Sequence, residues 1–177
     1  MIENRRFYRI PFFAKILLGT ADKVYSANCV NLSQGGVFIS LLQVEEFRRD
    51  MPCYAVIGLG PNIPPITFES SIKRLALPSP NPEKLYGLGL SFDKGSQESR
   101  DLLNDYLDDV KDNYELLGTL LGQGEPDIRS LKPIFSELFL PHFVDLAQLK
   151  TYVDRVLKSI EMIDQQHSMP QQNNASS

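Results

Sequence analysis

The sequence predicts a mainly β domain, a small closed sheet of six strands, followed by a helical C-terminal extension. The first half of the chain consists of short apolar runs separated by turns rich in glycine, proline and asparagine. Closure of such a sheet is favoured because it leaves no strand edge exposed. In the second half, apolar residues recur at helical spacing instead. A chain of 177 residues has room for one domain and an appendage.

Six segments have the composition expected of strands, and each is bounded by turn-forming residues. The strands are expected at residues 12–18, 24–30, 37–41, 53–59, 66–77 and 85–92. The run EEFRRDM, which precedes the fourth strand, is too short to assign. The stretch VNLSQGG at 30–36 separates the second and third strands and, taken alone, is best explained as a turn.

Two amphipathic segments predict helices in the second half. Apolar residues recur every three or four positions from Leu103 to Leu121 and again from Leu146 to Ile163. Each seam is shorter than three heptads, which is short for a coiled coil. The helices could fold back on each other or on the barrel. They could also pair with a second subunit and make the protein a homo-oligomer through 103–121 and 146–163.

The segment between these helices, residues 130–146, is unusually apolar and contains two prolines. Pro133 fits the first turn of a helix, whereas Pro141 would break one. Its aromatic residues are expected to pack in the core or against a partner, since aromatic clusters usually reflect burial.

The net charge of −4 is distributed unevenly along the chain. Residues 1–40 carry five basic and two acidic side chains, a net charge of +3, and residues 41–96 carry six of each. Residues 97–177 carry seven basic and fourteen acidic side chains, a net charge of −7. A basic N-terminus points to an anionic partner. The acidic remainder argues against DNA or RNA, whose binding usually needs a broader basic face.

Neither a membrane span nor a signal peptide is recognisable. The longest apolar runs are far shorter than the roughly 18 residues that suggest a span, and the N-terminus has no long apolar region or cleavage site. Cys29 and Cys53 lie in apolar runs, where buried thiols are common. This fits a reducing compartment without requiring it, and we expect a cytoplasmic protein.

The sequence carries few signatures of an enzyme or a metal site. His142 and His167 are distant in sequence from each other and from the cysteines, and neither HExxH nor paired CxxC motifs occur. NLSQGG is not a G-x-S-x-G nucleophile motif, and YGLGLSF lacks the third glycine of a dinucleotide fingerprint. The acidic side chains of 101–112 fit the solvated face of a helix. The sequence therefore predicts a non-enzymatic protein with no metal site and no cofactor.

Two N-terminal features could form a ligand site. In RRFYR, Arg5 and Arg9 are four residues apart with Arg6 between them, and guanidinium groups match phosphate oxygens and the O6/N7 edge of guanine. In VNLSQGG, Asn31 and Ser33 offer short polar side chains. Glycine permits a positive φ and a close approach of the backbone to a ligand; the two glycines of this stretch are Gly35 and Gly36. Each feature is weak singly, because a charged terminus and a turn would explain them.

The order of these motifs resembles the PilZ domain family. Arg5 and Arg9 match its R-x-x-x-R motif, and Asn31, Ser33 and Gly36 match its D/N-x-S-x-x-G motif. SIKRLAL followed by a loop and YGLGLSF is similar to the last two strands of the family's barrel. The resemblance covers about residues 3–109 and includes a helix packed after the barrel.

The resemblance implies a six-stranded PilZ-type antiparallel β-barrel that binds the bacterial second messenger cyclic di-GMP. By analogy, the arm with Arg5 and Arg9 wraps over the ligand, and Asn31 and Ser33 meet a guanine base. Gly36 keeps the loop low enough for the ligand. We therefore expect a receptor that orders its N-terminal arm on binding and signals to a protein partner.

The alternative is a PilZ-like adaptor or structural protein that no longer senses the nucleotide and assembles through its C-terminal helices. In either case we expect three regions. Residues 1–109 form the barrel with its arm and the start of the packed helix. Residues 110–166 form the helical extension, and 167–177 form a polar, disordered tail.

Overall fold

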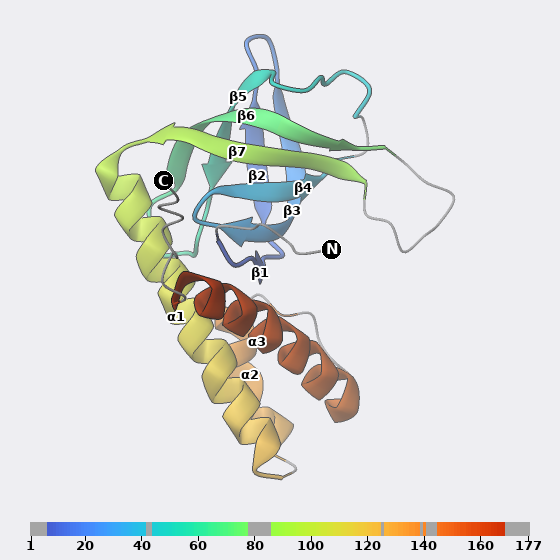
Figure 1. Cartoon of the computed structure of the whole chain (residues 1–177), viewed down its shortest axis with the longest axis vertical. Coiled ribbons are helices and arrows are strands. Elements are labelled where there is room, and N and C mark those ends of the chain that lie inside the picture. Colours follow the sequence, from blue (N-terminus) through green and yellow to red (C-terminus); the bar gives the residue numbers. More distant parts are fainter. Residues whose placement is uncertain are drawn as a thin grey trace, which may run out of the picture.

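The computed structural model describes residues 7–41, 44–77, 86–124, 126–138, 140 and 145–168 of the chain. Strands make up the first half of this part and helices the second (Figure 1). The strands are β1 (Ile10–Pro11), β2 (Lys15–Gly19), β3 (Val24–Ser33), β4 (Gly36–Ser40), β5 (Pro52–Ile57), β6 (Ile66–Ala76) and β7 (Gly87–Gly95). The helices are α1 (Gln97–Gly122), α2 (Ile128–Glu137) and α3 (Leu146–Ser168).

Strands β2 to β7 form a closed antiparallel barrel, as the sequence predicts. The order of neighbours is β3-β2-β5-β6-β7-β4, and the pairing of β3 with β4 closes the sheet. The two-residue strand β1 pairs with β3 at Leu32 and Asn31, beyond the residues of β3 that pair with β2. The sequence does not predict β1 because a segment of two residues that contains a proline has no strand periodicity.

The prediction of a loop at residues 30–36 is wrong in its extent. β3 continues through Ser33 and β4 begins at Gly36, so that only Gln34 and Gly35 form the turn. Most of VNLSQGG is therefore strand, and its polar residues lie on the wall of the barrel. The other strands begin and end within a few residues of their predicted bounds.

A β-bulge in β3 determines which face of the barrel Asn31 occupies. Cys29 pairs with Ile39 and Asn31 pairs with Phe38, so Val30 is the extra residue. Alternation alone would give Cys29 and Asn31 the same face. Because a bulge shifts the alternation by one residue, Cys29 and Leu32 are both buried in the core, and Asn31 joins Phe38 on the outer face.

The barrel core continues into the helices. Phe12 and Tyr106 of α1 meet edge to face at a centroid distance of 5.7 Å, and one contiguous cluster of buried side chains includes residues from β1 to α3. α1 begins directly after β7, where the side chain of Ser96 accepts a hydrogen bond from the backbone N–H of Ser99. Such an N-cap satisfies one of the free N–H groups of the first turn.

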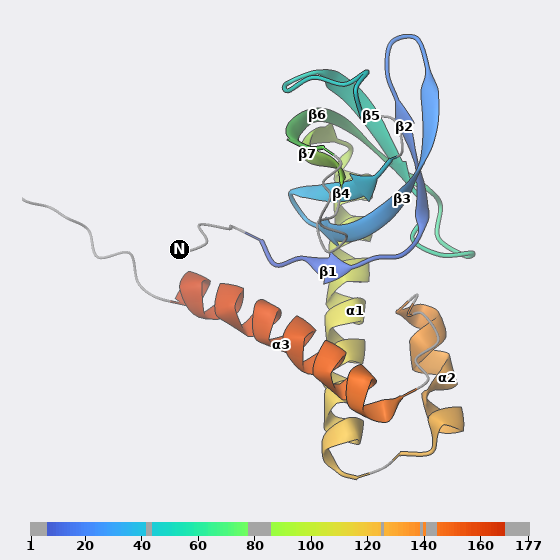
Figure 2. The same ribbon diagram turned by 90° about the vertical axis from the view of Figure 1, so that its right-hand side faces the viewer.

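Helices α2 and α3 pack on opposite sides of α1, and the barrel packs on the upper half of α1 (Figure 2). The predicted seams face the interior of this single chain. In α1 they are Leu103, Leu107, Val110, Tyr114, Leu117 and Leu121, and in α3 Leu149, Val153, Val156, Ile160 and Ile163, all of them buried; Leu146, the first residue of the second seam, is partly buried. The helices therefore fold back on each other, and α1 also packs on the barrel. Pairing with a second subunit stays a prediction.

The apolar segment 130–146 contains most of α2. Pro133 is the sixth residue of this helix, which begins after the N-cap Asp127, so the expectation that it lies in the first turn is wrong. Leu131, Leu138 and Leu140 are buried, and of the aromatic residues Phe135 is partly buried against the core, while Phe139 and Phe143 lie outside the described residues. Pro141 and His142 lie outside the described residues, as do residues 169–177 of the predicted tail; α3 ends at Ser168. Within the described helices, none is long and apolar enough to cross a bilayer.

Candidate functional site

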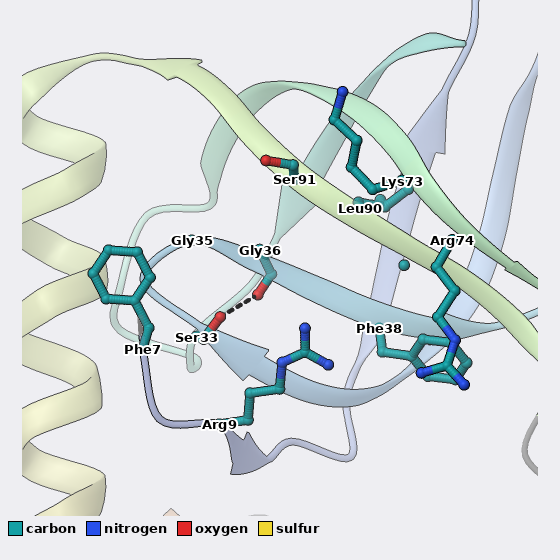
Figure 3. Close-up of a pocket in the computed structure, with 11 residues that line it drawn as sticks. Phe7, Arg9, Ser33, Gly35, Gly36, Phe38, Lys73, Arg74, Leu90 and Ser91 are labelled. Carbon is teal, nitrogen blue, oxygen red and sulfur yellow. Dashed lines mark hydrogen bonds between the residues drawn. The ribbon is translucent and has the colours of Figure 1, made fainter. Parts of the chain in front are cut away.

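A pocket of about 460 Å³ lies on the outer wall of the barrel, where the N-terminal segment crosses the ends of β3 and β4 (Figure 3). Side chains from β6 and β7 form its far wall. It is lined by Phe7, Arg9, Ser33, Gly35, Gly36, Phe38, Lys73, Arg74, Gly89, Leu90 and Ser91. Four of the seven residues predicted from the two motifs therefore meet here, namely Arg9, Ser33, Gly35 and Gly36.

Ser33 anchors the turn between β3 and β4. Its side chain is 4% exposed, and its hydroxyl donates a hydrogen bond of 3.0 Å to the carbonyl oxygen of Gly36. A donated bond leaves the oxygen free to accept one from a ligand, since a hydroxyl has one donor and two acceptor sites. The hydrogen bond therefore fixes Ser33 at the pocket without using up its capacity to bind.

The two glycines are needed for close packing and have ordinary backbone angles. Among the described residues, positive φ occurs at Asp50, Gly87 and Gly124, so neither Gly35 nor Gly36 uses the positive φ that glycine permits. A Cβ atom at Gly36 would collide with the carbonyl oxygen of Leu90 on β7, and one at Gly35 would lie 2.7 Å from Cδ2 of Phe7. Gly36 brings β4 against β7, and Gly35 provides the surface on which Phe7 packs.

Asn31 lies beside the pocket on the outer face of β3, between its strand partners Pro11 and Phe38. Its Oδ1 atom is buried and has no hydrogen-bond partner among the described residues. Leaving a buried acceptor unpaired is costly, so an unsatisfied oxygen at this place is a natural acceptor for a ligand N–H.

Arg9 approaches the pocket through β1. Ile10 pairs with Leu32 and Pro11 with Asn31, and the same register places Arg9 opposite Ser33. Its guanidinium extends over β3 and β4 toward the middle of the pocket (Figure 3). Arg5 and Arg6 lie outside the described residues.

Sequence reasoning missed Lys73 and Arg74, the residues that β6 contributes to the pocket. The guanidinium carbon of Arg74 lies 5.9 Å from the centroid of the Phe38 ring. Lys73 forms an ion pair of 2.7 Å with Asp50, which raises the pKa of the lysine and lowers that of the carboxyl group. These residues are distant from both motifs in sequence. The one signal was their place in the predicted strand SIKRLAL, which carries two adjacent cations.

The pocket is electropositive. Arg9, Lys73 and Arg74 line it, and its described lining contains no carboxylate. Within the described ranges, no group of three His, Cys, Asp or Glu side chains could hold a metal ion. Both cysteines are free and buried; burial raises the pKa of Cys53 to about 11 and also raises that of Cys29. Such thiols are protonated at neutral pH and poor nucleophiles. The arrangement is suited to binding an anion with flat aromatic groups.

Parts of several solved structures are similar to this chain. The inhibitor of motility MotI/DgrA of Bacillus subtilis has a TM-score of 0.51 at 18% identity, over 59% of this chain and 49% of that one. MrkH of K. pneumonia, solved in complex with c-di-GMP, has a TM-score of 0.49 at 16% identity, over 62% and 53%. PlzA of Borreliella burgdorferi, also solved with c-di-GMP, has a TM-score of 0.43 at 19% identity, over 59% and 41%.

The match to each of these structures covers about half of its length or less. No curated protein matches the sequence. The sequence model of the PilZ domain, in contrast, matches residues 3–109, which is more than half of the chain. The chain therefore belongs to the PilZ domain family.

Proposed function

We propose that this protein is a non-enzymatic receptor for cyclic di-GMP. The observation that carries the proposal is the pocket in which Arg9 lies opposite Ser33, beside the unsatisfied Oδ1 of Asn31. The three cations suit the two phosphates of the ligand, and the acceptor on Asn31 suits an N–H group of guanine. MrkH and PlzA, which are similar to part of this chain, were solved in complex with c-di-GMP.

Titration calorimetry tests this proposal directly. Wild-type protein should bind cyclic di-GMP, and Arg9→Ala and Ser33→Ala should each weaken binding by roughly tenfold or more, because a hydrogen bond to a charged group contributes about 1.5–3 kcal/mol. Circular dichroism should show both variants folded. Absence of heat from folded wild-type protein would disprove the receptor.

We further propose that the N-terminal arm, including Arg5 and Arg6, becomes ordered over the ligand and passes the signal to α1. Phe7 lines the pocket, and the next residue reaches the helix: the hydroxyl of Tyr8 lies 3.5 Å from both the carbonyl oxygen of Leu107 and Oδ1 of Asp108. Ligand at Arg9 would thus change a contact with α1 one residue away. Hydrogen exchange of residues 103–112 should slow on ligand addition in wild type and less so in Tyr8→Phe.

The partner of such a receptor would recognise the helical extension, which we propose begins near residue 110. We also propose a cytoplasmic location.

The alternative, an adaptor that assembles through its helices, is less favoured because the seams of α1 and α3 are buried against each other. Light scattering decides between them. We expect a mass near the 20.0 kDa of one chain, whereas a larger mass without nucleotide binding would support the adaptor.

A further inference from the structure

Arg74 reaches the outer surface of the barrel because of a second β-bulge. Ile72 pairs with Leu90 and Arg74 pairs with Gly89, so Lys73 is the extra residue of β6. Without the bulge, alternation would give Arg74 the same face as Ile72, which is fully buried in the core. Bulges near binding sites commonly re-aim a side chain, and this one turns a guanidinium toward the pocket (Figure 3).

The bulges of β3 and β6 place Arg74 and Asn31 in one row across the outer wall. Arg74 pairs with Gly89 of β7, Gly89 pairs with Phe38 of β4, and Phe38 pairs with Asn31 of β3. A row of cross-strand partners on one face places their side chains side by side. Asn31 carries the unsatisfied buried Oδ1, so the two polar ends of this row flank an aromatic ring.

Gly89 keeps the middle of the row open. A Cβ atom there would lie 3.0 Å from Cβ of Arg74 and 3.8 Å from Cδ2 of Phe38. With no side chain at this position, Arg74 can lie across β7 and cover Phe38, which is 6% exposed. Phe38 does not belong to the core cluster that contains Val37 and Ile39, so its burial comes from neighbours on the outer face. The Phe38 ring therefore provides a flat surface beneath the planar guanidinium of Arg74.

We propose that Arg74 is a base-recognising residue of this site: its guanidinium stacks on the guanine whose edge is bound by Asn31. This inference rests on the proposed function. Guanidinium groups stack on flat aromatic systems. The Arg74 guanidinium already lies over the aromatic ring of Phe38. Arg9 reaches the same pocket from the N-terminal segment and Arg74 reaches it from β6, so the two arginines would hold separate parts of one dinucleotide.

Calorimetry with cyclic di-GMP on Arg74→Ala and Arg74→Lys tests the role of the planar group. We expect Arg74→Ala to weaken binding at least tenfold. Arg74→Lys should recover only a minor part of the loss, because an ammonium group keeps the charge but cannot stack as a plane. Full recovery of the affinity in Arg74→Lys would overturn the proposal, since it would show that Arg74 contributes only its positive charge.

Arg100→Ala is the matched control. The guanidinium carbon of Arg100 lies 6.0 Å from the centroid of Phe68, a pair of the same kind, and Arg100 does not line the pocket. This variant should bind like wild type, and urea unfolding of both alanine variants measures any structural cost of losing the pair. If Arg74→Ala binds within twofold of wild type while Arg9→Ala does not bind, the inference fails and the proposed function stands. If folded wild type does not bind, both fail.

Discussion

At the scale of single residues, the site depends on a glycine that has no room for a side chain. A Cβ at Gly36 would collide with the backbone of Leu90 across the β4–β7 pair. Because the colliding atom belongs to the backbone of a paired strand, a change of side-chain rotamer could not relieve the contact. Gly36 thus has a structural role that is independent of any ligand.

We therefore expect Gly36→Ala to destabilise the folded barrel by about 1–3 kcal/mol, in the range typical of overpacking. The midpoint of urea unfolding measures this. Gly58→Ala is the control, since a Cβ at Gly58 meets nothing within 4 Å. Equal midpoints for the two variants would contradict the collision. Loss of ligand binding by Gly36→Ala alone would not establish contact with the nucleotide.

The two buried thiols provide a pH-dependent test of the barrel core. The pKa of Cys53 is raised from 9.0 to about 11, with burial as the main cause and the charge of Asp93 as a smaller one. A thiol whose pKa is raised on folding favours the folded state below pH 9, the unfolded value, and this contribution is lost as the pH rises through 11. Burial also raises the pKa of Cys29.

Alkylation by iodoacetamide should therefore be slow at both cysteines in native protein below pH 9, and Cys53 should begin to react as the pH approaches 11. In urea, both should react according to their ordinary thiol pKa. Peptide mass spectrometry at a series of pH values measures the two rates separately. Rapid native alkylation of Cys53 at pH 7 would show that the thiol is more exposed than 3%.

At the scale of secondary-structure elements, the sequence predicts what depends on local patterns. Apolar runs between turns predicted the six barrel strands, and helical periodicity predicted α1 and α3. The sequence did not predict strand β1, the bulges at Val30 and Lys73, or the position of Pro133 within α2. A bulge depends on pairing with a partner strand that is distant in sequence, so alternation within one strand cannot reveal it.

The same limit explains which parts of the candidate site could be predicted. Arg9, Ser33 and Gly36 belong to motifs and were expected at one site. Arg74 was not, because it comes some 40 positions after Ser33 and only barrel closure brings their strands to the same pocket. The close approach of Gly36 to β7 could not be predicted for the same reason, since it also depends on barrel closure.

The contact between α1 and α3 depends on Gly118. A Cβ there would lie 2.6 Å from Cδ1 of Leu157. We expect Gly118→Val to destabilise the protein by about 1–3 kcal/mol through overpacking. Gly122→Val is the matched control on the same helix, since a Cβ at Gly122 meets nothing within 4 Å. Thermal unfolding followed by circular dichroism compares the two.

A double mutant separates this contact from the helix propensity of valine. Leu157→Ala removes the colliding methyl group, so the cost of Gly118→Val with Leu157→Ala should be less than the sum of the two single costs. Strict additivity would show that α1 and α3 do not meet at these residues in solution.

At the scale of the whole molecule, α1 joins the barrel to the helical bundle. Its first half packs against the barrel through Tyr106, and its second half packs on α3, where Gly118 faces Leu157. The buried side chains of both parts form one contiguous cluster. The boundary expected at residue 109 falls within this continuous helix, so unfolding of either part would disrupt a surface that the other part uses.

We therefore expect a single cooperative unfolding transition that cyclic di-GMP shifts as a whole. A ligand that binds the folded state stabilises it by RT ln(1 + [L]/Kd), which is about 2.7 kcal/mol at a hundredfold excess over Kd. For a chain of this size, this corresponds to a rise in Tm of roughly 5–10 °C. Differential scanning calorimetry at increasing nucleotide concentration measures it, and Arg9→Ala should show little or no shift. Two transitions, of which the nucleotide moves only one, would show that the barrel and the bundle unfold separately. In that case the continuous helix would not carry the stabilisation from the pocket to α3, and a partner on the helical extension could not sense the ligand through stability alone.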